Sequence, residues 1–284
     1  MNKYIYPLML LAMISWAIAW TNAKIVGEYL SFYNLIFLRF LLGFISLVPF
    51  ILIRKSPIPK IAHIKYIIIP SILFFIYNLA FFKGTHLGLA GKGAILVTTL
   101  NPLFTVLIMS IINKNIVKKE FLGILIGIIG GIVIMDVYNE GIDVIIDNNN
   151  IYFIICATTW GFMTVCINYA QKFIDPYMFI GLCYLFTMLI SIPFINLGEI
   201  NISSLDFRFY FNFFFVSIGA MSFGTSIYMY STPILGPSKA SIFIFSVPLF
   251  AMGTAYIFLN EAFTINIILG GLLGLVAIYI VNRT

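Results

Sequence analysis

The residues of this sequence that could do chemistry are polar and aromatic side chains set inside long apolar stretches. A polar group inside hydrocarbon is costly unless it meets a partner or water, so residues of this kind are candidates for a functional site. The chemistry they offer is non-covalent: hydrogen bonding, charge attraction and aromatic contact with a small solute. The candidate substrate-binding residues are Trp16, Arg39, Tyr77, Asn78, Lys92, Thr98, Asn101, Trp160, Tyr228, Lys239 and Ser246.

Three of these candidates are basic, and each allows two interpretations. Arg39 lies inside its apolar stretch, where it could bind a substrate anion or act as a structural cation bonded to main-chain carbonyls. Lys92 and Lys239 open their stretches, where the helix macrodipole opposes an ammonium, so helix stability does not explain them. Either these lysines snorkel to the interface, or they form two cationic gates, one at each membrane face, that attract an anionic solute.

Two prolines mark candidate hinges. Pro102 and Pro248 fall within apolar stretches, where each removes a main-chain hydrogen bond and frees a carbonyl. Thr98 and Asn101 flank the first proline, and Ser246 flanks the second. Matched prolines in equivalent helices predict a hinge or a binding site beside these two helices.

Residues for covalent or metal chemistry form no recognisable pattern. The cysteines, Cys156, Cys166 and Cys183, lie in apolar stretches without metal-ligand spacing, and the two histidines cannot make a metal site alone. The phosphate loop G-x-x-x-x-G-K followed by Ser or Thr does not occur. Glycine runs at 123–131 and 270–274 lie inside helices and predict close helix packing. We therefore expect no enzyme activity, no metal and no cofactor.

Composition predicts the surroundings of the chain. Apolar residues make up 62% and charged residues 9%, against roughly 45–50% and 25% in soluble domains. Too little polar surface remains to cover a water-soluble globule, so we expect an all-α membrane protein with the lipid bilayer as its partner. The net charge of +6 would suggest nucleic acid in a soluble protein. Here the basic residues lie between apolar stretches, so we interpret them as a topology signal and expect no nucleic acid.

Hydropathy predicts ten transmembrane helices. Each apolar span, of about 17 to 23 residues, is long enough to cross about 30 Å of hydrocarbon. A polar stretch at 139–150 separates five spans from five, so we expect one repeat at 4–138 and another at 151–281. The predicted spans are 4–22, 32–53, 66–84, 91–112, 121–138, 151–170, 176–196, 209–230, 239–259 and 265–281.

The second half repeats the first at a spacing of 144 to 147 residues. Trp16 recurs as Trp160 and Lys92 as Lys239, and the Pro-Leu-Phe run at 102–104 recurs at 248–250. Five helices, an odd number, must enter the membrane from opposite sides in the two copies, so the repeats are expected to be inverted. Inverted repeats support alternating access in transporters.

The basic residues predict the orientation. With the N-terminus inside, the inner segments hold most of the lysines and arginines, and the outer segments hold most of the acids. We therefore expect a multi-pass protein of the plasma (inner) membrane with both termini in the cytoplasm. The first span ends near a run that resembles a signal-peptidase site, but it has a repeat partner at 151–170, so we expect its retention. The inner basic residues are Lys3, Arg54, Lys55, Lys60, Lys65, Lys114, Lys118, Lys119, Lys172 and Arg283.

Two motifs resemble the signature of the EamA family in the drug/metabolite transporter superfamily. The resemblance covers essentially the whole chain as two EamA repeats. It implies a ten-helix bundle with both termini inside, a cavity lined mainly by helices 1, 3, 4, 6, 8 and 9, and export of amino acids or other small metabolites. Lys114 stands where the family's usual Glu follows helix four, whereas Glu261 keeps it in the second repeat. The motifs are Gly91-Lys92-Gly93-Ala94 with Asn101-Pro102-Leu103-Phe104, and Ser246-Val247-Pro248-Leu249-Phe250 with Asn260-Glu261 and Gly270-Gly271.

No Asp or Glu lies in the middle of any predicted span, so a buried carboxylate switch is not expected, and the basic groups should make the path positive. We predict a secondary transporter that exports small metabolites such as amino acids or other carboxylate-bearing solutes. The alternatives are an exporter of lipophilic cations or drugs, which would want an acid in the cavity, and a membrane scaffold that transports nothing. The sequence leaves a homodimer open as the oligomeric state.

Overall fold

The computed structural model describes residues 4–115, 117–146, 150–199 and 205–282. Within these residues the chain is helical, without a β-strand. Nine of the described spans are long and apolar enough to cross a membrane, and α5 (Lys118–Ile134), with 17 residues, is a tenth long apolar helix. The predicted all-α fold with ten spans is confirmed, with span ends a few residues from their predicted places.

Each half contributes five spans. Two spans of the second half are composite: α10 (Phe207–Phe214) continues through a π-helical segment (Phe215–Thr225) into α11 (Ser226–Leu235), and α12 (Pro237–Ile242) continues through a 3-10 turn (Phe243–Ser246) into α13 (Val247–Leu259). The other long helices are α1 (Ile5–Val26), α2 (Phe32–Arg54), α3 (Lys65–Leu87), α4 (Ala90–Asn113), α8 (Asn150–Ala170), α9 (Pro176–Ser191) and α14 (Ile265–Asn282).

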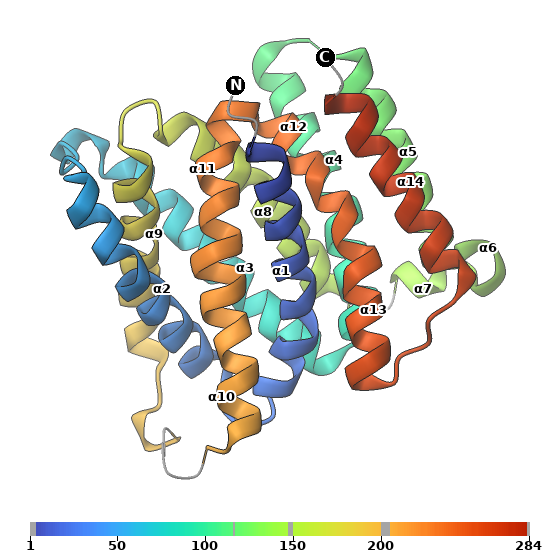
Figure 1. Cartoon of the computed structure of the whole chain (residues 1–284), viewed down its shortest axis with the longest axis horizontal. Helices are drawn as coiled ribbons and strands as arrows, with labels where there is room; N and C mark the ends of the chain where they lie inside the picture. The colour runs from blue at the N-terminus through green and yellow to red at the C-terminus, as the bar shows by residue number, and fades with distance from the viewer. Residues whose placement is uncertain (1–3, 116, 147–149, 200–204, 283–284) are drawn as a thin grey trace.

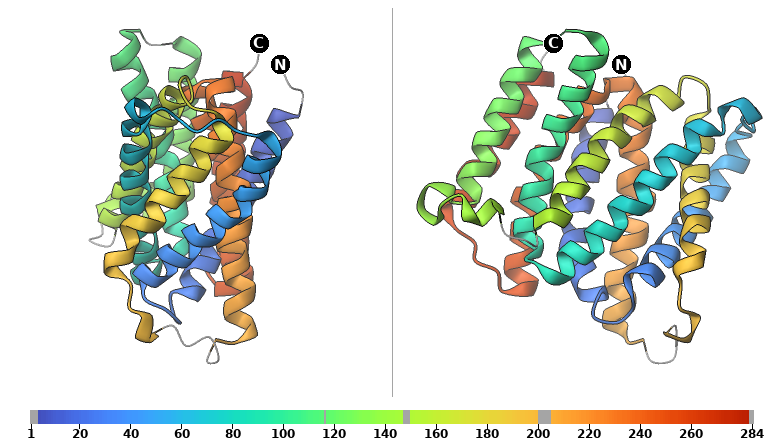
Figure 2. Two further views of the ribbon diagram at one scale, coloured as in Figure 1. Left: turned by 90° about the vertical axis from the view of Figure 1, so that its left-hand side faces the viewer. Right: turned by 180° about the vertical axis from the view of Figure 1, so that it is seen from behind.

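The two halves run in opposite directions. Both termini lie at one end of the bundle, which we call the terminal end (Figure 1). Helix α1 runs away from the terminal end, whereas α8, the first long helix of the second half, runs toward it (Figure 2). The polar stretch that joins the halves holds two short helices, α6 (Val137–Glu140) and α7 (Asp143–Ile146), while its residue Asp147 lies outside the described residues. The repeats are therefore inverted, as the odd number of spans requires.

The repeat partners α5 and α14 pack against each other through glycines. A Cβ atom on Gly270 would lie 2.4 Å from the carbonyl oxygen of Gly130, and one on Gly130 would lie 2.8 Å from that of Gly270. Such distances are shorter than any van der Waals contact, so only glycine permits this approach. Small residues at a shared interface are the usual means by which membrane helices pack closely, which agrees with the interpretation of the glycine runs.

The two prolines occupy different local structures. Pro102 lies inside the continuous helix α4, as predicted. Pro248 lies near the middle of the span 237–259, as predicted, but this span is not a continuous α-helix: Pro248 stands in the first turn of α13, directly after the 3-10 turn. A proline there costs little, because the first helical N–H groups have no intrahelical acceptor.

The π-helical segment is unusual for its length, because π-helical hydrogen bonding occurs mostly as single turns. Its carbonyls accept hydrogen bonds from side chains of three other helices, which hold the segment against the rest of the bundle. The donors are Trp16 of α1 to Ala220 O, Arg39 of α2 to Val216 O and Tyr184 of α9 to Met221 O.

Candidate functional site

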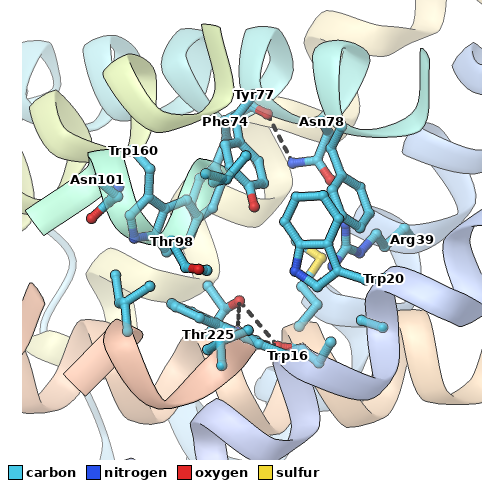
Figure 3. Close-up of a pocket in the computed structure, with 17 residues that line it drawn as sticks. Trp16, Trp20, Arg39, Phe74, Tyr77, Asn78, Thr98, Asn101, Trp160 and Thr225 are labelled. Carbon is cyan, nitrogen blue, oxygen red and sulfur yellow. Dashed lines mark hydrogen bonds between the residues drawn. The ribbon is translucent and has the colours of Figure 1, made fainter. Parts of the chain in front are cut away.

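A cavity lies between the two halves, about half-way along the long helices (Figure 3). It offers about 40 Å³ to the centres of water-sized molecules, where one buried water needs about 10–15 Å³ by the same kind of measure. The cavity therefore has room for a few waters. Its lining residues are Trp16, Ala19, Trp20, Arg39, Phe74, Tyr77, Asn78, Phe81, Val97, Thr98, Asn101, Trp160, Ala220, Met221, Thr225, Ile244 and Val247.

Helical spacing explains which side chains reach the cavity. On α3 the lining residues Phe74, Tyr77, Asn78 and Phe81 follow each other at intervals of three, one and three residues, which is one face of an α-helix. Helices α1 and α4 contribute shorter sets with the same spacing. The cavity thus lies among α1, α3, α4, α8 and the composite spans, which agrees with the helices implied by the resemblance, and it adds α2 through Arg39.

The repeated tryptophans meet across the centre of the molecule. The rings of Trp16 and Trp160 pack edge to face with centroids 4.9 Å apart, and Tyr228 lies 5.0 Å from Trp16 and 5.7 Å from Trp160. The Trp16 N–H donates to Ala220 O and to the Thr225 hydroxyl, both at 3.1 Å. Since the two tryptophans come from opposite halves, any separation of the halves here must break this aromatic contact.

Arg39 supplies the one charged side chain among the residues that line the cavity. It is 6% exposed, and it donates to Val216 O at 3.0 Å and to the Asn78 side-chain oxygen at 2.6 Å. Its guanidinium lies 5.5 Å from the centre of the Phe81 ring, within cation–π range. A guanidinium has five N–H groups, so the two hydrogen bonds to described residues leave donors for a further partner.

Asn101 presents an unsatisfied acceptor at the cavity. Its side-chain nitrogen donates to Ala157 O of α8 at 3.3 Å, whereas its side-chain oxygen is buried without a hydrogen-bond partner among the described residues. The Trp160 N–H is also buried near the Tyr228 hydroxyl without completing a well-formed hydrogen bond. Buried polar atoms normally have partners, so each exception calls for an explanation such as water or a ligand.

The structure brings together seven of the eleven predicted site residues and separates four from the cavity. The seven are Trp16, Arg39, Tyr77, Asn78, Thr98, Asn101 and Trp160. Of the others, Tyr228 packs behind the tryptophans, and the buried Ser246 closes the 3-10 turn by donating to Phe243 O at 2.8 Å. Lys92 and Lys239 lie near the starts of α4 and α12, at opposite ends of the bundle (Figure 1). The binding roles of all eleven stay predictions.

The starts of α4 and α12 are repeat partners with different surroundings. Glu261 reaches from the second half to the start of α4, where its Oε2 accepts from the Gly91 N–H at 3.1 Å. Its Oε1 is buried without a hydrogen-bond partner among the described residues. A Cβ on Gly91 would lie 2.6 Å from the Oε2 atom of Glu261, so a larger residue there would have to displace the Glu261 side chain. The start of α12 instead borders a hollow of about 190 Å³. This hollow is lined by Met109, Ser110, Asn113, Asn115, Val117, Glu120, Leu235, Gly236, Pro237, Ser238 and Lys239.

Several lining residues were not predicted from the sequence. Phe74 and Phe81 could have been found by extending the helical spacing from Asn78 along α3. Thr225 and Met221 could not, because their positions depend on the π-helical segment, for which the sequence gives no local signal. In the described residues, no group of three His, Cys, Asp or Glu side chains could hold a metal ion.

Comparison with known proteins agrees with this architecture. A WAT1-related chloroplastic protein of Arabidopsis thaliana is 25% identical over 210 residues, which make up 68% of this chain and 48% of that protein. The chain therefore spans about half the length of that curated relative. A crystal structure of another protein has 15% sequence identity and a TM-score of 0.76, over 99% of this chain and 97% of the other. That similarity supports the fold alone.

The family assignment rests on both halves. The EamA-like transporter family matches the chain twice, over residues 3–136 and again over residues 149–283. Each match covers one of the two inverted halves, and the cavity lies between them. The chain is a multi-pass membrane protein, and it belongs to the EamA-like transporter family.

Proposed function

We propose that this transporter exports small carboxylate-bearing metabolites, such as amino acids, by alternating access of its two inverted halves. The observation that carries the proposal is Arg39, a buried guanidinium at a cavity whose described lining contains no Asp or Glu. The cavity therefore has one cationic group, aromatic walls and no built-in counter-charge.

The charge of Arg39 favours an anion over a cation. Ion attraction is stronger at a buried site than in water, because the effective dielectric constant is lower. The contacts of Arg39 with Val216 O and Asn78 offset part of its desolvation, yet both partners are uncharged. A planar carboxylate matches the fork of N–H groups on a guanidinium and can accept two of them. The anionic end of the substrate is therefore assigned to Arg39.

Alternating access follows from the relation of the halves. Separation of the halves at one end would expose the cavity to one side of the membrane, and separation at the other end would expose it to the opposite side. The contact of Trp16 with Trp160 lies at the centre of this movement. Pro102 interrupts the hydrogen bonding of α4 beside the cavity and remains the proposed hinge, together with the break before Pro248.

The terminal end is proposed to face the cytoplasm of a plasma membrane. The loops at this end carry Lys55, Lys60, Lys114 and Lys172, and cytoplasmic loops are enriched in Lys and Arg. Lys3 and Arg283, which the sequence also assigns to this side, lie outside the described residues. Labelling of single cysteines placed in the loops of intact cells would test the orientation.

Reconstituted transport tests the proposal. Proteoliposomes that hold the purified protein should accumulate labelled amino or organic acids by counterflow. Arg39→Met should reduce this transport by at least about tenfold, because a hydrogen bond to a charged group contributes about 1.5–3 kcal/mol and 1.4 kcal/mol corresponds to a factor of ten. Arg39→Lys, which keeps the charge, should retain part of it, and size-exclusion profiles should show that both variants are folded.

Two results would overturn this function. Transport of organic cations without any response to carboxylates would favour the exporter of lipophilic cations, for which the aromatic walls of the cavity are suited. Absence of transport across a panel of anions, zwitterions and cations, by protein that is folded and correctly inserted, would favour a scaffold.

A further inference from the structure

A cluster of aromatic rings lies at the terminal end, where the start of α3 meets the end of α8. The ring of Tyr66, in the first turn of α3, stacks on that of Phe173 with centroids 5.2 Å apart and lies 5.4 Å from that of Tyr169. His63 lies 5.4 Å from Phe173. Tyr169 and Phe173 are 48% and 44% exposed. This terminal aromatic cluster therefore draws on both halves and is open to the surroundings.

Two lysines are held over the terminal aromatic cluster. Lys65 Nζ lies 5.1 Å from the centre of the Tyr66 ring, and Lys172 Nζ lies 5.5 Å from the centre of the Tyr169 ring. Both distances are within cation–π range. Because the two rings are neighbours, both ammonium groups are drawn to the same small area of the surface, where like charges repel each other. An aromatic face attracts a cation, but it does not neutralise the charge.

Acidic residues are scarce around these lysines. In the two segments that form the cluster, 54–66 and 169–177, the one acidic residue is Asp175. Its carboxylate caps α9 by accepting from the main-chain N–H groups of Tyr177 and Met178 at 3.1 and 3.2 Å. Neither Lys65 nor Lys172 forms an ion pair in the described part of the chain. The positive charge over the cluster is therefore left without a counter-charge from these residues.

The segment that joins α2 to α3 adds exposed apolar side chains and further cations. Ile58 and Ile61 are 87% and 85% exposed, and they are interspersed with Lys55 and Lys60. The segment lies at the terminal end, at the level where two membrane-spanning helices end (Figure 2). Exposed isoleucines are unfavourable in water but stable among acyl chains, while lysines beside them reach the lipid headgroups. This pattern is typical of a segment that lies along the membrane surface.

We propose that this surface binds the headgroup of an anionic phospholipid, with Lys65 and Lys172 at its phosphate and with Ile58 and Ile61 inserted among acyl chains. A phosphate between the two ammonium groups relieves their repulsion and can accept hydrogen bonds from both. Free phosphate would satisfy the lysines but not the isoleucines, so a phospholipid is the ligand that matches both. The site lies away from the cavity, and the inference does not rest on the proposed function.

Thermal unfolding in detergent tests the binding. Dioleoyl phosphatidylglycerol should raise the Tm of the unmodified protein by at least about 3 °C more than dioleoyl phosphatidylcholine does at the same concentration, because a ligand of the folded state stabilises it. The two lipids have the same acyl chains and differ in the net charge of the headgroup. Added salt should reduce the difference, since salt screens exposed charges.

Variants locate the effect. Lys65→Gln with Lys172→Gln should remove most of the difference between the two lipids, because both ammonium groups at the phosphate are lost. Lysine-to-arginine changes at the same two positions should keep it. Ile58→Ser with Ile61→Ser should lower the Tm rise given by phosphatidylglycerol, and the high exposure of both side chains makes a folding defect in this variant unexpected.

The matched control is Lys114→Gln with Lys118→Gln. It removes the same charge at the same end of the bundle, from exposed lysines that lie over no aromatic ring in the described residues. This variant should keep the difference between the lipids. An equal loss in the control would overturn the proposal, because net charge alone would then explain the effect.

Two further results would overturn the proposal. Equal Tm rises with both lipids would show that the surface does not recognise the anionic headgroup. A rise with inorganic phosphate as large as that with phosphatidylglycerol would assign the lysines to a free anion instead. No solute is transported in these measurements, so either result leaves the proposed carboxylate transport untouched, and a failure of that transport leaves the lipid site untouched.

Discussion

The fourth span and its repeat partner in the second half differ in how they begin and in how they continue. Helix α4 begins at Ala90, its Gly91 N–H donates to the carboxylate of Glu261, and the helix runs without interruption through Pro102. Its partner begins beside an open hollow and breaks at the 3-10 turn before Pro248. The first span is therefore a continuous helix whose start contacts the other half, whereas the second starts beside a hollow and is divided by a 3-10 turn.

This difference shows what inverted symmetry determines and what it leaves to single residues. Because the repeats are inverted, equivalent helices begin at opposite ends of the bundle, so the topology alone does not distinguish the two ends. The carboxylate of Glu261 distinguishes the two ends, since it joins the halves at the end opposite the termini. A hydrogen bond therefore joins the halves at the Gly91 end, whereas the start of α12 at the terminal end borders a hollow.

The largest effect is expected where the repeats are alike, at the glycine contact of α5 with α14. Gly270→Val should lower the free energy of unfolding by about 3 kcal/mol or more, because overpacking against a backbone cannot relax by a change of rotamer. Gly253→Ala is the control, since a Cβ there meets nothing within 4 Å. Thermal unfolding in detergent measures both, and an unchanged Tm for Gly270→Val would contradict the close packing.

The next effect concerns the end of the bundle where Glu261 contacts Gly91. Glu261→Gln removes the negative charge at the start of α4 and weakens its hydrogen bond to the Gly91 N–H. A hydrogen bond to a charged group contributes about 1.5–3 kcal/mol. The equilibrium between conformations in which the halves are joined or separated at this end should therefore shift by about tenfold or more toward separation. A cysteine introduced at Thr21, which is 1% exposed and hydrogen-bonded to Thr254 of α13, should become faster to label. The native cysteines are replaced by serine for this measurement. Unchanged labelling would mean that other contacts close this end.

A smaller effect is expected from introducing, at the terminal end, a carboxylate equivalent to that of Glu261. Helices α4 and α13 both end in a left-handed residue, Lys114 at φ 51° and Asn260 at φ 55°. Counted from these caps, the structural equivalent of Glu261 is Asn115, one residue beyond the Lys114 suggested by sequence alignment. Asn115→Glu should place a carboxylate in the hollow beside Ser238 and slow the labelling of a cysteine at Ser238, whereas Lys114→Glu should not.

The smallest effect compares the starts of α3 and α10, which are also repeat partners. Ile64 precedes α3 without a side-chain cap, whereas Asp206 caps α10 by accepting from the Phe209 N–H at 2.8 Å. This hydrogen bond, with that from Tyr29, lowers the pKa of Asp206 below its ordinary 3.8.

Because the pKa of Asp206 is lower in the folded state than in the unfolded state, its ionised carboxylate stabilises the fold at pH values above the pKa of the unfolded state. This stabilisation is lost as the pH falls through the pKa of the folded state. Asp206→Ala should therefore lower the Tm slightly at neutral pH, and the difference should shrink as the pH falls below the ordinary carboxyl pKa of 3.8. Asp206→Asn, which caps without titrating, should show no such convergence toward Asp206→Ala. A Tm difference between the unmodified protein and Asp206→Ala that is constant with pH would contradict the role of the carboxylate.

The sequence predicted the elements well because a membrane restricts them strongly. Spans long enough to cross hydrocarbon, together with the recurrence of Trp16 as Trp160, were sufficient for the inverted ten-span fold. The contact of Glu261 with Gly91 could not be predicted, since it joins residues 170 positions apart and depends on how the halves pack. Hydropathy also does not distinguish an α-helix from a 3-10 turn, so the break before Pro248 was missed.

For the candidate site, the sequence indicated individual residues but not their partners. Polar residues at depth indicated Arg39, Asn78 and Asn101, because burial of such groups in apolar spans needs a reason. The partners of these residues could not be read from spacing. The hydrogen bond of Arg39 to Val216 O requires the π-helical segment, which forms only in the packed bundle.

The π-helical segment also bears on how a duplicated gene changes length. Pro49 and Pro193 lie 144 residues apart, whereas Lys92 and Lys239 lie 147 apart, so the second copy holds three more residues between these landmarks. The span in this interval has 27 residues in the first copy and 29 in the second. A π-helical turn closes its hydrogen bonds over five residues rather than four, so it takes in additional residues without a matching increase in height. The additional residues of this span are thus accommodated within a bilayer of fixed thickness, where an inserted loop would have exposed unpaired backbone to lipid.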